Sequence, residues 1–211
     1  MSLLRLVTGV LVVSALSADS QLDLLLRKVE TRYNSAKTLQ VLYTEQYTTG
    51  RGISQPESGV LYLRKPGRMR WDYTQPKGKL WVADGKYHYL YNPTENHVEK
   101  GKLKDSEDMR APLAFLLGKL HFDKDFRNLK STQEGSDTRV TAQPSRDDLP
   151  YSAVEFVVTF DDRIKELKVT GFDHSILKFT FDQEKLNPPL DDKLFKFQMP
   201  PGATLEEDSG Q

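Results

Sequence analysis

The chain has 211 residues, enough for one domain of ordinary size. Its 30 lysines and arginines balance its 30 aspartates and glutamates, so it lacks the basic excess typical of proteins that bind nucleic-acid phosphates. The chain contains no cysteine, which excludes a disulfide framework, a thiolate zinc site, a cysteine nucleophile and lipid attachment through an N-terminal cysteine.

The first residues are typical of an export signal. Arg5 gives a short positive region, an apolar run follows over residues 6–16, and Ala15 and Ser17 are small enough for a signal peptidase site. The run is shorter than the roughly 20 residues that a membrane-spanning helix needs. We therefore expect residues 1–18 to be a cleaved signal peptide and residues 19–211 to form a single exported domain.

An amphipathic helix is predicted directly after the signal. One face of this helix carries apolar side chains at helical spacing, namely Leu22, Leu25, Leu26, Val29 and Tyr33. Charged side chains lie on the rest of the helix surface. We expect this helix to end near residues 34–37.

From residue 38 the apolar period changes from 3.6 to 2, which is typical of strands. Short alternating runs up to residue 93 are separated by turn signals that contain glycine or proline. Asp84-Gly85, between two such runs, is the strongest hairpin signal in the chain. These features predict an antiparallel meander.

A short, very apolar helix is predicted over residues 106–118. Met109, Leu113, Leu116 and Leu117 lie at helical spacing, and Pro112 should kink the helix. Alternation then resumes at residue 138 and continues to a last run over residues 194–205, with Phe195, Phe197 and Met199 on one face.

About ten or eleven antiparallel strands and two or three helices are expected in total, and a sheet of that length must curl or close. We therefore predict a mainly β fold whose sheet curls or closes, with apolar helices available to cover its concave face.

Motifs for catalysis or metal binding are missing from the sequence. The four histidines, His88, His97, His121 and His174, show no metal-ligand spacing, and only His121 lies close to an aspartate, Asp123. There is no nucleophile elbow, phosphate-binding glycine loop or His-Glu-x-x-His motif. We expect no enzyme, no cofactor and no metal, although the two separated carboxylates of a β-rich hydrolase would leave no motif.

The cationic stretch over residues 62–76 divides its side chains between two faces. If residues 65–67 form a turn, Met69 and Trp71 share one face of the next strand, and Arg68 and Arg70 share the other. A platform for single-stranded nucleic acid needs aromatic and cationic side chains on the same face. We therefore expect no nucleic-acid partner.

A series of motifs runs from residue 59 to residue 93: Gly59, Lys65-Pro66-Gly67, Arg70-Trp71-Asp72-Tyr73, Gln75-Pro76, Asp84-Gly85-Lys86 and Tyr91-Asn92-Pro93. A Phe-x-Phe-x-x-Pro-x-Gly run follows at residues 195–202. The series closely resembles the strand core of the outer-membrane lipoprotein carrier family, the LolA-type periplasmic lipoprotein chaperones. The order of helices and strands is similar over essentially the whole mature chain.

The resemblance implies a periplasmic protein with an incomplete antiparallel β-barrel, an open half-barrel with an α-helical lid over an apolar cavity. Such a carrier binds the acyl chains of lipoproteins released by an inner-membrane ABC-type complex and carries them to an outer-membrane lipoprotein acceptor, without a cofactor. We expect a monomer. An arginine before the turn proline holds the lid closed in the family. Here that position is Lys65, and Arg64 lies beside it on the opposite face, so these two residues are the expected lid latch.

Alternation predicts which side chains line the cavity, and core packing is the alternative interpretation for each. The expected acyl-chain-binding residues are Leu22, Leu26, Leu61, Leu63, Met69, Trp71, Trp81, Leu90, Leu113, Leu116 and Leu117.

Other proteins could share these features. The outer-membrane acceptor is similar in shape but is anchored through an N-terminal cysteine, which this chain lacks. A periplasmic binder of other lipids or glycolipids would present the same apolar face, and a β-rich interaction protein would bury the same aromatic residues in a filled core. The sequence leaves the choice between lipoprotein and another lipid open.

Overall fold

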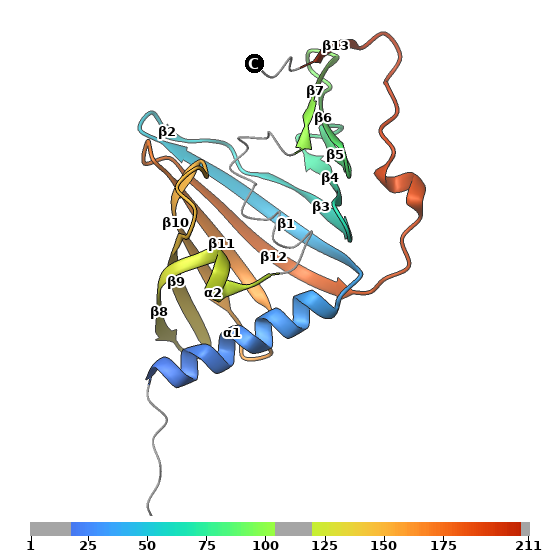
Figure 1. Cartoon of the computed structure of the whole chain (residues 1–211). Helices are drawn as coiled ribbons and strands as arrows, with labels where there is room; N and C mark the ends of the chain where they lie inside the picture. Colours follow the sequence, from blue (N-terminus) through green and yellow to red (C-terminus); the bar gives the residue numbers. More distant parts are fainter. Residues whose placement is uncertain (1–17, 104–119, 208–211) are drawn as a thin grey trace, which may run out of the picture.

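The computed structural model describes residues 18–103 and 120–207 (Figure 1). Almost all of the predicted signal peptide lies outside the described residues. So does the predicted helix at 106–118, with Leu113, Leu116 and Leu117. Within the described part of the chain, no helix is both long and apolar enough to cross a membrane.

Helix α1 (Ala18–Ser35) confirms the first helix prediction. Its apolar face packs against the sheet, and Leu22, Leu26, Val29 and Tyr33 are each at most 9% exposed. In Figure 1 the helix, drawn in blue, crosses one side of the curled sheet. Burial of this face, rather than helix propensity, provides most of the stability of such a helix.

Thirteen strands of the described chain form one sheet. In chain order they are β1 (Thr38–Thr49), β2 (Gly52–Ile53), β3 (Glu57–Arg64), β4 (Arg68–Gln75), β5 (Leu80–Asp84), β6 (Tyr87–Asn92), β7 (His97–Lys102), β8 (Phe126–Glu134), β9 (Asp137–Pro144), β10 (Tyr151–Val158), β11 (Ile164–Gly171), β12 (Ile176–Leu186) and β13 (Thr204–Glu207). A four-residue helix, α2 (Phe122–Asp125), precedes β8, and a 3₁₀ helix, η3 (Asp192–Phe195), follows β12.

The spatial order of the strands is β13-β7-β6-β5-β4-β3-β1-β12-β11-β10-β9-β8, and the short β2 pairs with β1. Neighbours are antiparallel, except that β13 runs parallel to β7. The two end strands, β13 and β8, do not pair with each other, so the sheet is an open barrel. The predicted fold class is confirmed, with more strands than expected.

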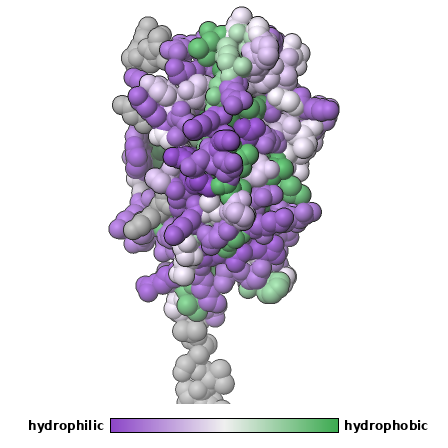
Figure 2. Space-filling view, turned by 90° about the vertical axis from the view of Figure 1, so that its right-hand side faces the viewer, coloured by the Kyte–Doolittle hydropathy of each residue, from purple (hydrophilic) through white to green (hydrophobic). Residues whose placement is uncertain are grey.

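The predicted last strand is wrong in its position. Residues 192–195 form η3, and β13 begins only at Thr204. Pro200 and Pro201 have no backbone N–H to donate to a ladder. The segment instead runs along the outside of the sheet, where Arg70 Nη1 donates a hydrogen bond of 3.0 Å to the Leu194 carbonyl. Figure 2 shows this side of the molecule, which is mainly hydrophilic with small hydrophobic patches.

The two faces of the sheet bury separate groups of side chains. The main apolar cluster lies on the inner face beneath α1 and includes Leu61, Trp71 and Trp81. Val82 and Phe195 are also buried, at 0% and 1% exposure, but they lie outside that cluster, where η3 packs on the outer face of β4 and β5. The inner face is therefore where a site beneath helix α1 can form.

Candidate functional site

The inner face is apolar over the central strands. Leu61 of β3 pairs with Trp71 of β4, and Trp71 pairs with Trp81 of β5, so the three side chains lie in one row across the sheet. The Trp71 ring also packs edge to face with the Tyr43 ring, with the ring centres 4.5 Å apart, and its centre lies 5.5 Å from that of the Phe179 ring. All of these side chains are at most 5% exposed, and together they form the floor beneath α1.

The structure brings together the predicted cavity residues that it describes. They belong to one apolar cluster, with Leu90 partly buried against it: Leu22, Leu26, Leu61, Leu63, Met69, Trp71 and Trp81. The helix contributes two of them and the sheet the others. A cluster at this place is what an apolar binding site beneath a helical lid requires.

The inner face becomes polar at the far end of β1, β3 and β4. Glu45 of β1 is 7% exposed and stands opposite Glu57 of β3. Lys79 Nζ pairs with the Glu57 carboxylate at 2.6 Å and lies 4.5 Å from the centre of the Tyr73 ring. The floor is therefore amphipathic along the strands.

Gly59 allows two tyrosines to stand on either side of it at this polar end. It pairs with Tyr43 on β1 and with Tyr73 on β4, and the two rings meet edge to face at 5.7 Å. A Cβ at position 59 would lie 2.0 Å from the Asp72 carbonyl oxygen and 3.0 Å from the Tyr43 hydroxyl. Any larger residue would displace backbone, which explains the glycine in the sequence motif.

Lys65 attaches the end of helix α1 to the sheet. Its Nζ donates a hydrogen bond of 2.7 Å to the Tyr33 carbonyl in the last turn of the helix, and its backbone N–H donates to the Lys37 carbonyl at 2.9 Å. A cation at a helix C-terminus is also favoured by the helix dipole. Burial at this junction lowers the pKa of Lys65.

Arg64 contacts a different part of the molecule. Its guanidinium donates to the Asp192 carboxylate and to the Leu190 carbonyl, and it lies 5.7 Å from the centre of the Phe195 ring. These contacts hold the C-terminal segment on the outer face. Of the two predicted latch residues, Lys65 therefore contacts α1, whereas the side-chain contacts of Arg64 in the described chain are with residues 190–195.

Glu184 is a second anchor for α1 that the sequence did not reveal. Its side chain is 6% exposed and accepts hydrogen bonds from Arg32 Nη2 at 2.7 Å and from the Tyr33 hydroxyl at 2.7 Å. The Tyr33 hydroxyl accepts in turn from the Ile164 N–H at 2.9 Å. Burial and the adjacent Glu184 carboxylate both raise the pKa of Tyr33.

The helix is also joined to the segment before α2. Asn34 exchanges two hydrogen bonds with the backbone of Leu120, at 2.8 and 2.7 Å, and Glu30 Oε1 accepts from the Phe122 N–H at 2.7 Å. All these polar anchors lie in the last two turns of α1.

One group of possible metal ligands occurs in the described chain. Single ligand atoms of Glu30, His121 and Asp123 lie within 4.8 Å of one another. Sequence spacing could not reveal this group, because Glu30 comes from α1. The Glu30 carboxylate already accepts a backbone hydrogen bond, and exposed carboxylates such as Asp123 gather without any metal, so we assign no metal site here.

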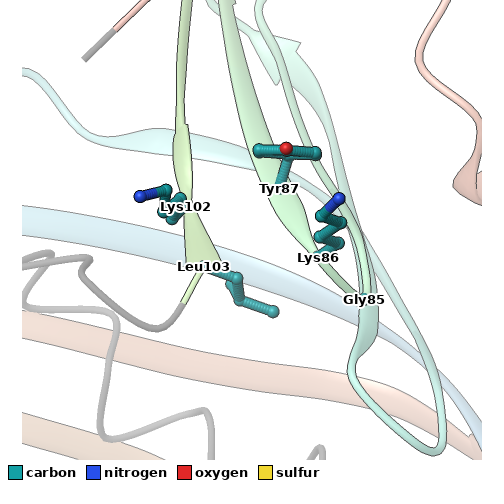
Figure 3. A pocket seen from close by; sticks show the side chains of 5 residues that line it. All are labelled: Gly85, Lys86, Tyr87, Lys102 and Leu103. Atoms are coloured by element: carbon teal, nitrogen blue, oxygen red, sulfur yellow. The ribbon is translucent and has the colours of Figure 1, made fainter. Parts of the chain in front are cut away.

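A pocket of about 470 Å³ opens where the β5–β6 turn meets the end of β7. It is lined by Gly85, Lys86, Tyr87, Lys102 and Leu103 (Figure 3). Its volume is in the range of small-molecule sites. The pocket lies close to the latch, because a Cβ added at Gly67, two residues after Lys65, would be 3.5 Å from the Gly85 Cα.

Comparison with known proteins gives a consistent result. The family model described as "Outer membrane lipoprotein carrier protein LolA" matches residues 34–198. A protein of Aeromonas salmonicida, described as an outer-membrane lipoprotein carrier protein, is 31% identical over 192 residues, which cover 90% of each chain. A protein of Chromobacterium violaceum with the same description is 24% identical over 203 residues, which cover 96% of this chain and 97% of that protein.

A solved structure has the same fold. It is that of an uncharacterized conserved protein from Thermus thermophilus, with a TM-score of 0.53 and 12% sequence identity, over 89% of this chain and 99% of that chain.

Proposed function

Because the chain belongs to the LolA family of outer-membrane lipoprotein carrier proteins, we propose that it carries lipoproteins through the periplasm. Its cargo would come from an inner-membrane ABC-type release complex and go to an outer-membrane lipoprotein acceptor. Residues 1–18 would serve as the cleaved signal and residues 19–211 as the carrier domain. The transfer needs binding and release but no bond cleavage, so we propose no catalytic role.

The observation that supports this function best is the apolar inner face beneath a helix that has a group of polar anchors near its C-terminal end. The anchors at Glu30, Arg32, Tyr33 and Asn34 belong to the last two turns of α1. The first half of the helix contacts the floor through Leu22 and Leu26. Acyl chains can replace such contacts without leaving a buried polar group unpaired.

The energetics of this exchange suit a carrier. Each methylene group of a buried acyl chain contributes about 0.8 kcal/mol, so a complete chain in water-free surroundings would bind too tightly for prompt release. Displacing helix side chains that are already buried offsets part of that gain, because their own apolar surface returns to water. Binding would then be strong enough for transport and weak enough for transfer.

The proposal is tested by a matched pair of substitutions, Leu61→Asn and Val82→Asn. Both side chains are 0% exposed and lie on nearby strands, but Leu61 faces the inner cluster and Val82 lies outside it. Each change buries an amide in apolar surroundings, so the two variants should lose similar stability. The assay measures how much triacylated lipoprotein the purified protein removes from inner-membrane vesicles with the release complex and ATP.

We expect wild type and Val82→Asn to release lipoprotein into the soluble fraction and Leu61→Asn to release at least tenfold less, a loss of about 1.4 kcal/mol. Equal release by the two variants, at equal folded fractions, would contradict an acyl-chain site on the inner face. Uptake of free phospholipid but not lipoprotein by the wild type would instead indicate a carrier of another lipid.

A further inference from the structure

The pocket between the β5–β6 turn and the end of β7 has two cationic side chains at its rim. Lys86 and Lys102 are exposed residues of neighbouring strand ends, and in Figure 3 Tyr87 stands between them. Tyr87 pairs with Lys102 across β6 and β7, and the Lys86 ammonium lies 5.0 Å from the centre of the Tyr87 ring. In Figure 3 the Lys86 side chain lies beside Tyr87, whereas the Lys102 side chain extends from β7 away from that ring, so the two cations line the pocket from neighbouring strand ends.

These two lysines are not neutralised by carboxylates of the described chain. Over residues 18–103 and 120–207, neither Lys86 nor Lys102 takes part in an ion pair, whereas the neighbouring Lys100 is paired with Glu207 at 2.8 Å. Asp84 is the acid closest in sequence to Lys86, and its Oδ1 accepts the N–H groups of Lys86 and Tyr87, both at 2.8 Å, within the turn. Among the described residues that line the pocket, the charged ones are therefore the two lysines.

The wall of the pocket connects this charged rim to the apolar interior. Leu103 lines the pocket and also packs, partly buried, against the main apolar cluster, as does Leu90 on the adjacent strand. In Figure 3 the Leu103 side chain extends away from Lys102. A ligand in the pocket would therefore meet ammonium groups at one end and aliphatic surface at the other.

We propose that this pocket binds the phosphate of an anionic amphiphile, such as the head group of an acidic phospholipid, while the amphiphile's acyl chain lies along Leu103 toward the inner face. The inference rests on the proposed function, because it assumes that the inner face accepts acyl chains. Ammonium groups attract a phosphate as point charges, and the Tyr87 ring and Leu103 add apolar contact. The site would give the carrier a preference for anionic lipids over zwitterionic ones.

The test uses lysophosphatidylglycerol and lysophosphatidylcholine with the same acyl chain, each below its micelle concentration, and inorganic phosphate as a third probe. Binding to the mature protein is measured by titration calorimetry at low and at moderate salt. The test variant is Lys86→Gln/Lys102→Gln. The control is Lys77→Gln/Lys130→Gln, which removes the same charge from two exposed lysines outside the pocket.

We expect wild type and control to bind the anionic lipid about tenfold more tightly than the zwitterionic one, and the test variant to lose that preference. A tenfold difference in affinity is about 1.4 kcal/mol, which is about what two exposed ion pairs contribute together. Added salt should reduce the preference. Equal affinity for the two lipids, or a preference that survives in the test variant, would overturn the proposal.

Phosphate that binds as tightly as the anionic lipid would overturn the amphiphile assignment, because the acyl chain would then contribute nothing. If neither lipid binds wild type and lipoprotein uptake also fails, the proposed function itself fails. Normal lipoprotein uptake together with no charge preference would refute only the present inference.

Discussion

Changing Lys65 to methionine should loosen helix α1 without unfolding the sheet. The substitution keeps an unbranched apolar stem and removes the ammonium that donates to the Tyr33 carbonyl at 2.7 Å. A hydrogen bond from a charged group contributes about 1.5–3 kcal/mol when its surroundings favour it. The lowered pKa of Lys65 shows that burial disfavours the charged form, which offsets part of this gain. We therefore expect a net loss of about 1 kcal/mol.

Such a loss corresponds to about fivefold more of the state in which α1 is detached. Hydrogen exchange followed by mass spectrometry should show about fivefold faster exchange in peptides from Ala18–Ser35 of Lys65→Met, and unchanged exchange in peptides from Tyr151–Val158. Lys65→Arg, which retains the cation, should stay close to wild type. Unchanged exchange of α1 in Lys65→Met, or an equal increase in both regions, would refute the latch assignment.

The pH dependence of this contact has a definite sign. Because burial lowers the pKa of Lys65 below 10.5, the unfolded chain binds more protons than the folded one between the two pKa values. The free energy of unfolding of wild type relative to Lys65→Met should therefore rise as the pH increases through that window. Denaturant titrations of both proteins from pH 7 to 10.5 measure the difference, and a decrease would contradict the burial of this amine.

Three further predictions concern stability. Glu184→Gln removes the charge that pairs with Arg32, so we expect a loss of about 1–3 kcal/mol in urea titrations, with Glu184→Asp intermediate. Gly59→Ala forces a Cβ to within 2.0 Å of the Asp72 carbonyl oxygen and should cost more than about 2 kcal/mol; a smaller loss would mean that β3 and β4 can separate locally. Burial raises the pKa of Tyr151 to about 12, so wild type should lose on the order of 2 kcal/mol relative to Tyr151→Phe as the pH rises from 10 to 12, with the contribution of Tyr33 cancelling between the two proteins.

Much of the fold was predictable because its central strands alternate cleanly. The runs that became β3, β4 and β5 place Leu61, Trp71 and Trp81 on one face, and a one-residue change of register would expose all of them. Strands β7 and β8 escaped prediction because they lie near or at the edges of the sheet and carry mostly polar residues, which edge strands tolerate.

Parts of the candidate site could not be predicted because they depend on a local strand irregularity or on contacts between distant segments. The pairing of β1 with β12 shifts register between Gln40 and Leu42, and Gln183 adopts a positive φ of 51°. This irregularity interrupts the alternation on β12, and Glu184 reaches α1 beyond it. The pocket beside Gly85 likewise depends on two strand ends that only the folded sheet brings together, so no local motif marks it.

Native mass spectrometry of the mature protein purified from the periplasm tests the carrier function most directly. A lipoprotein carrier should include a fraction of molecules with the added mass of a lipoprotein, and that fraction should be lost in Leu61→Asn but not in Val82→Asn. A wild-type protein found only without ligand, which also takes up no lipoprotein from the release complex, would contradict the carrier function. The inner face would then be a filled core, and the protein would bind partners by its surface.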